Sequence, residues 1–115
     1  MTEQRIQQEI RLALGRGNVR VFRNNTGALR DENGRLVRYG LCTGSADLIG
    51  LRKVVIGPEH VGQTMGQFVA VEVKTATGRL TREQQAFLRL VEAFGGLAGV
   101  ARNVEEAVRL VERPP

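Results

Sequence analysis

The most hydrophobic strand expected in this chain carries an acid and a base on one face. Phe68–Lys74, FVAVEVK, is apolar at five of its seven positions, which predicts a β-strand. Glu72 and Lys74 are two residues apart, and alternate side chains of a strand share a face. The fold must therefore cover an apolar strand and accommodate a carboxylate and an ammonium group at its end.

The pattern after this strand predicts an α/β domain. Thr81–Phe94 is expected to form an amphipathic helix, with Thr81 as N-cap and Gln84 completing a capping box. Gly95 and Gly96 end it. The other expected elements are a helix after Thr2 that ends at Gly15 or Gly17, strands at 19–23, 47–51 and 97–101, and a helix at 104–112 capped by Asn103.

Two segments leave alternatives open. Residues 24–46 are rich in Asn, Gly and charge, which predicts a long loop or a mobile hairpin. Residues 53–57, KVVIG, either continue the preceding strand or pair with it. Residues 58–67 contain one proline and two glycines, Pro58, Gly62 and Gly66, and are expected to form a loop that connects two strands.

Composition narrows the class of function. A chain of 115 residues has room for one domain, and its net charge of +5, mostly from Arg, favours a polyanionic partner, nucleic acid first. A basic surface without a specific partner is the alternative. Single copies of Cys42 and His60 exclude a disulfide or a Cys-rich zinc site within one chain and disfavour Ser-His-Asp chemistry. Without a signal peptide or membrane-length apolar run, a soluble protein in the cytoplasm of a bacterial or phage-infected cell is expected.

Two carboxylates are candidates for a metal site. Asp47 opens one expected strand, and Glu72 lies near the end of another. If these strands are neighbours, the two charges repel, and a divalent cation compensates. Mg²⁺ or Mn²⁺ takes oxygen ligands and keeps waters that can attack phosphate, while Lys74 neutralises the phosphate or positions the water. The alternative is a solvated Glu72–Lys74 pair on an edge strand.

Four segments together resemble a known nuclease group. GSADLIGL, VAVEVKT, GRLTREQQAFL and GGLAGVARNVEEAV, in this order, resemble the PD-(D/E)xK nuclease superfamily and, within it, the VRR-NUC (virus-type replication-repair nuclease) domain. The resemblance covers nearly all of the chain. Asp47 stands at the first acid, although Ala46 precedes it where the family pattern has Pro. Glu72-Val73-Lys74 matches the E-x-K, and Gln84 matches a downstream glutamine, with Gln85 as the neighbouring possibility.

This resemblance implies a fold and an activity. The fold is a restriction-endonuclease-like core, a central mixed β-sheet flanked by helices, in a single domain over residues 1–115. The activity is that of a metal-dependent, structure-selective DNA endonuclease, with four-way-junction cleavage by a homodimer, since symmetric cleavage needs two sites. Asp47, Glu72 and the Val73 carbonyl would ligate the metal, Lys74 would orient the attacking water, and Gln84 would help to position the substrate. The alternative is a non-catalytic nucleic-acid-binding module of the same fold.

The first helix offers a further acidic ligand. The family is similar to archaeal Holliday-junction resolvases, which carry a metal-binding Glu on the first helix. Glu3 lies about 35° from the centre of the apolar stripe and Glu9 about 85°, at roughly 100° per residue. We expect Glu3 to be the ligand, while its alternative role is an acid that interacts with the helix dipole.

The segment after the first strand suggests nucleic-acid contacts. In relatives FRNNTG, residues 22–27, lies near the active site, so Arg23 and Asn25 are expected phosphate contacts, as are Arg38 and Lys74. The alternative for the Asn residues is turn formation, and for the Arg residues simple solvation. With 4% aromatic residues, base stacking is not expected to drive binding, which favours recognition of backbone shape.

Overall fold

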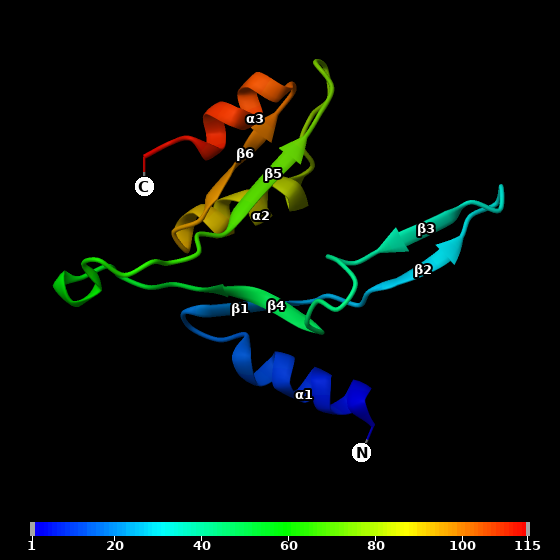
Figure 1. Ribbon diagram of the computed structural model, residues 1–115, viewed down its shortest axis with the longest axis horizontal. Coiled ribbons are helices and arrows are strands. Elements are labelled where there is room, and N and C mark those ends of the chain that lie inside the picture. Colours follow the sequence, from blue (N-terminus) through cyan, green and yellow to red (C-terminus); the bar gives the residue numbers. More distant parts are fainter. Residues whose placement is uncertain (1, 115) are drawn as a thin grey trace. The chain divides into compact units, whose positions relative to one another are not determined.

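The computed structural model describes residues 2–114 and separates the chain into two compact units, one up to Arg52 and one from Lys53 onward (Figure 1). Each unit is described by itself. The first contains α1 (Glu3–Leu14), β1 (Val19–Arg23), β2 (Gly27–Arg30), β3 (Leu36–Tyr39) and β4 (Leu48–Arg52). The second contains the 3₁₀ helix η1 (Pro58–His60), β5 (Val69–Val73), α2 (Arg82–Ala93), β6 (Leu97–Ala101) and α3 (Val104–Val111).

In the first unit, α1 contacts an antiparallel pair formed by β1 and β4. The predicted helix is confirmed: the Thr2 hydroxyl accepts from the Arg5 amide at 3.2 Å, and Gly15, rather than Gly17, follows its last residue as C-cap. Segment 24–46 contains the antiparallel β2–β3 hairpin, so the hairpin alternative is confirmed. The register pairs Arg23 with Leu48, which places the end of β1 beside the start of β4.

The prediction of strand structure at 53–57 is wrong. These residues follow β4 without regular structure and lead into η1, where His60 Nδ1 accepts the Gly57 amide hydrogen at 2.9 Å. Val55 and Ile56 are exposed. β-branched residues favour extended backbone, but a strand also needs a partner ladder, and no partner pairs with this segment in the described part of the chain.

In the second unit, β5 and β6 form a parallel pair, with Glu72 opposite Val100. Parallel strands need a crossover connection, and α2 supplies it. The core consists of Leu88, Val91 and Ala98 with partly buried apolar neighbours. On the other face of β6, a Cβ at Gly99 would lie 3.1 Å from a methyl of Leu110 in α3, so β6 is covered on both faces.

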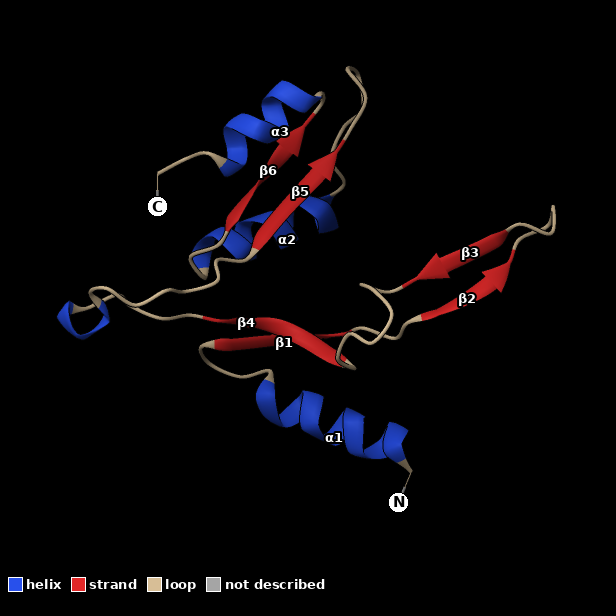
Figure 2. Ribbon diagram, in the orientation of Figure 1, coloured by secondary structure: helices blue, strands red, loops and turns tan. Residues whose placement is uncertain are grey.

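The crossover helix α2 begins at the end of β5 that carries Glu72 and Lys74. Because α2 returns the chain to the start of β6, its N-terminus lies at the carboxyl end of β5 (Figure 2). The Thr81–Gln84 capping box is confirmed, and Gly95 follows the helix with a positive φ of 92°. Glu72, Lys74 and the first turn of α2 are therefore brought to one end of the β5–β6 pair.

The α/β class is confirmed by parallel and antiparallel strand pairs with helices. One central mixed sheet that contains all of these strands stays a prediction, because the two units are described separately. A single domain over residues 1–115 likewise stays a prediction. The longest helices, α1 and α2, have 12 residues each, and no helix within residues 2–114 has the length and apolar content to cross a membrane.

Candidate active site

Glu72 and Lys74 leave the same face of β5 and form an ion pair, as the strand period predicts. Lys74 Nζ lies 3.7 Å from Glu72 Oε1. The Lys74 amide donates to the Ala101 carbonyl at 3.1 Å, which continues the ladder past the end of β5 and fixes this orientation. The side chains are only 20% (Lys74) and 29% (Glu72) exposed, so this is a partly buried pair rather than a solvated one.

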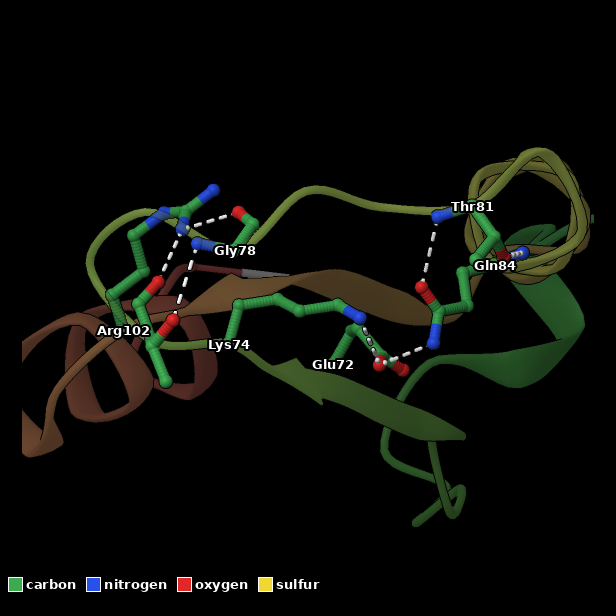
Figure 3. Close-up of polar contacts among 7 residues, drawn as sticks. Glu72, Lys74, Gly78, Thr81, Gln84 and Arg102 are labelled. Atoms are coloured by element: carbon green, nitrogen blue, oxygen red, sulfur yellow. Dashed lines mark hydrogen bonds and ion pairs between the residues drawn. The ribbon is translucent and has the colours of Figure 1, made fainter.

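Gln84 makes the second contact to Glu72. Its Nε2 donates to Glu72 Oε1 at 2.8 Å (Figure 3). Its carbonyl oxygen accepts from the Thr81 amide at 2.9 Å, and the Gln84 amide donates to the Thr81 hydroxyl at 3.1 Å. Because the capping box occupies the carbonyl end of the side chain, the NH₂ end must face the carboxylate. Of the two glutamines considered, Gln84 is therefore the one at this site, and Gln85 is exposed.

The two donors leave one side of Glu72 open. Both the ammonium of Lys74 and the amide of Gln84 reach Oε1, while Oε2 has no hydrogen-bond partner in the described part of the chain. A carboxylate held by one oxygen has a restricted orientation, and its second oxygen can accept a cation or a donor. Glu72 thus has the arrangement of an oriented ligand.

Arg102 supports the site in a way the sequence did not indicate. Its Nη1 donates to the Thr75 and Gly78 carbonyls at 2.5 and 2.8 Å and so holds the turn after Lys74 (Figure 3). A Cβ at Gly78 would lie 3.5 Å from Lys74 Cβ and Cδ, so this turn covers the lysine stem. Only the register of the two strands could have revealed this role. Val73 pairs with Ala101 in the parallel β5–β6 pair, so the next residues, Lys74 and Arg102, also lie side by side.

A second acidic location lies in the first unit. Glu3 and Asp47 line one cavity of about 290 Å³ together with apolar and polar side chains of α1 and β4, namely Ile6, Gln7, Ile10 and Leu48. Asp47 directly precedes β4. Glu9 does not line this cavity, and its carboxylate lies 3.6 Å from Arg5 Nε on the helix surface. The geometry therefore favours Glu3 over Glu9 as the partner of Asp47.

Three of the four predicted nucleic-acid contacts are exposed. Arg23 at the end of β1, Asn25 after it and Arg38 on β3 are all exposed. Lys74 is partly buried beside Glu72. Next to Asn25, sequence reasoning overlooked Asn24, which is buried and bonds to the segment before Asp47. Tandem asparagines are typical of turns, so the pattern gave no sign of its burial.

The predicted ligands suit a hard divalent cation in their chemistry. Glu3, Asp47, Glu72 and the Val73 carbonyl offer only oxygen, which Mg²⁺ and Mn²⁺ prefer. Within residues 2–114, no three acidic, His or Cys side chains form a ready metal cluster. Glu3 and Asp47 belong to the first unit, and Glu72 and Val73 to the second.

Fold and site together define a class: an α/β domain with an oriented carboxylate and a lysine at the end of a parallel strand. The model of the VRR-NUC domain family matches residues 1–105 of the 115-residue chain, so the chain belongs to the VRR-NUC domain family. Membership implies a nuclease-type function, with DNA as substrate. Neither a search of curated proteins nor a search of solved structures found a match.

Replacing Gln84 with Ala is expected to lower both activity and stability. The change removes the donor to Glu72 and half of the capping box, at a cost of about 0.5–1.5 kcal/mol per lost hydrogen bond. Gln85→Ala is the matched control, since it removes the same amide from an exposed neighbour. Denaturant unfolding and DNA cleavage rates would be measured for both. Equal losses of cleavage in the two variants would contradict the role of Gln84.

Proposed function

We propose that this chain is a metal-dependent, structure-selective DNA endonuclease. Glu72 carries the proposal, because Lys74 and Gln84 fix one of its oxygens and leave the other open. Asp47, Glu72, the Val73 carbonyl and Glu3 would hold Mg²⁺ or Mn²⁺. The shared cavity of Glu3 and Asp47 supports their part in this set.

The residues around Glu72 have distinct tasks in phosphodiester hydrolysis. A bound divalent ion would supply Lewis acidity that neutralises the phosphate charge and activates water. Lys74 places a positive charge where negative charge develops on the phosphate and orients the attacking water. Gln84 keeps Glu72 in one orientation and assists in positioning the substrate. Arg102 and the turn that it holds restrict the Lys74 side chain.

We propose branched DNA as the substrate, cut by a homodimer. The net charge of +5 and the exposed Arg23, Asn25 and Arg38 suit contacts to phosphate, and the low aromatic content disfavours reading by base stacking. A four-way junction presents two equivalent strands, and two copies of a one-site domain would match that symmetry. We place this activity in the cytoplasm of a bacterial or phage-infected cell.

Cleavage of labelled DNA tests the proposal. Four-way-junction, flap, duplex and single-stranded DNA would be incubated with the wild type and Glu72→Ala in Mg²⁺, Mn²⁺ or EDTA. We expect metal-dependent cutting that is strongest on the junction and absent from the variant, and a dimer by light scattering. Equal weak cutting by both proteins would indicate contamination. Salt-sensitive binding without cutting in either metal would instead support the non-catalytic module.

A further inference from the structure

Asn24 is a buried amide with all its polar atoms engaged. Its exposed fraction is 6%, and no other polar residue within residues 2–114 is buried. Its Nδ2 donates to Ser45 Oγ at 2.6 Å and to the Ala46 carbonyl at 2.9 Å, and its Oδ1 accepts from the Leu41 amide at 2.8 Å. A buried amide satisfied in this way has one preferred orientation, and removing a partner is costly.

Every partner of this side chain lies in residues 41–46, directly before Asp47. The backbone amide of Asn24 also donates to the Asp47 carbonyl at 2.8 Å. The segment has no helix or strand of its own and contains a turn in which the Ser45 amide donates to the Cys42 carbonyl at 3.0 Å. The backbone conformation of the residues that lead to Asp47 is therefore fixed mainly by hydrogen bonds to Asn24.

The chemistry of these partners demands an amide at position 24. Ser45 Oγ donates its hydrogen to the Cys42 carbonyl at 2.7 Å, so toward Asn24 it presents a lone pair. The Ala46 carbonyl presents another. A carboxylate at position 24 could still accept from Leu41, but its second oxygen would face these two acceptors without a hydrogen to share.

We infer that Asn24 is the positioning residue for Asp47, holding residues 41–46 so that the Asp47 carboxylate enters the cavity that it shares with Glu3. This inference rests on the proposed function, because it assigns Asn24 to the acidic side of that site. The side-chain polar atoms of Asn24 are occupied by Leu41, Ser45 and Ala46, so its assigned role is to act through Asp47. Residues that orient a ligand from behind typically change metal affinity by about 10–100-fold when replaced.

The test compares full-length wild type, Asn24→Asp and Asn24→Ala. Asn33→Ala is the matched control, because it removes an exposed asparagine from the hairpin turn. Mn²⁺ binding without DNA would be measured from the electron paramagnetic resonance of the free ion. Amide hydrogen exchange would be followed at residues 41–47. The Mn²⁺ dependence of cleavage would be recorded at temperatures where circular dichroism shows folded protein.

For Asn24→Asp we expect Mn²⁺ affinity to fall about tenfold or more, with faster exchange at Leu41 and its neighbours. The Mn²⁺ concentration for half-maximal cleavage should rise by a similar factor, while the rate at saturating Mn²⁺ largely recovers. General destabilisation would not produce this split. Should Asn24→Asp fail to fold, Ser45→Ala loses one acceptor of Asn24 and should show the same pattern at smaller amplitude.

Wild-type Mn²⁺ affinity in a folded Asn24→Asp variant would overturn the inference. So would a fall in the saturating rate with unchanged metal affinity. Absence of Mn²⁺ binding by the wild type would instead refute the proposed metal-dependent function, while the exchange data would still report whether Asn24 holds residues 41–46. The two failures are thus distinguishable.

Discussion

Glu72→Gln is expected to reduce metal-dependent DNA cleavage by about 10³-fold or more, since it removes a negatively charged ligand from the proposed site. The amide has nearly the volume of the carboxylate and can still accept from Gln84 Nε2, so the fold should persist. Its second terminal atom would be nitrogen, which donates and cannot ligate a hard cation. The loss should therefore appear in Mn²⁺ binding as well as in the single-turnover cleavage rate.

Glu83→Gln provides the control for this variant. Glu83 is an exposed acid in the first turn of α2, beside Gln84, and its replacement also removes one negative charge. It should cleave DNA at nearly the wild-type rate. If Glu72→Gln kept both Mn²⁺ affinity and cleavage, Glu72 would not be a metal ligand and the proposed function would lose its main support.

Local periodicity was sufficient to predict the face of its strand or helix on which a candidate side chain lies. The alternation of a strand predicts that Glu72 and Lys74 share a face, and the ion pair confirms this. The helical wheel favours Glu3 over Glu9, and Glu3 lines the cavity with Asp47. The face on which each of these side chains lies depends only on the geometry of its own element, which the residue pattern determines.

Features that depend on contacts between distant segments were not accessible in this way. The hydrogen-bond partners of the buried Asn24 side chain lie between 17 and 22 positions further along the chain. The residues next to Asn24 in the sequence suggest an ordinary turn. Arg102 reaches the site through the register of β5 and β6. Residues 53–57 failed as a strand for a related reason, since propensity describes a residue's own backbone and not the availability of a partner.

The choice between Gln84 and Gln85 lies between these cases. Both glutamines are at the start of one helix, and the resemblance to relatives allowed either. The capping box predicted that Gln84 turns back toward Thr81. That the other end of the same side chain then reaches Glu72 follows from the crossover, which places the first turn of α2 at the end of β5. Helix capping and site geometry thus use one side chain.

Lys74→Ala is expected to reduce cleavage by about 10²–10³-fold while leaving Mn²⁺ binding largely intact. The ammonium lies 3.7 Å from Glu72 Oε1, the oxygen that Gln84 also holds, so Glu72 keeps one anchoring donor when Lys74 is removed. The lost charge would have stabilised the phosphate in the transition state. For Lys74→Ala we therefore expect a lower cleavage rate at saturating Mn²⁺ with little change in Mn²⁺ affinity. Asn24→Asp should do the opposite, with lower Mn²⁺ affinity and a largely recovered rate at saturating Mn²⁺.

Lys53→Ala is the control, because Lys53 and Lys74 are the two lysines of the chain. The Lys53 ammonium lies 5.1 Å from the centre of the Phe94 ring, and its removal should cost about 0.5–1 kcal/mol of stability with cleavage nearly unchanged. Equal losses of cleavage in the two variants would mean that net charge, and not the position of Lys74, matters. Undiminished cleavage by Lys74→Ala would exclude Lys74 from the chemistry and leave it as a structural partner of Glu72.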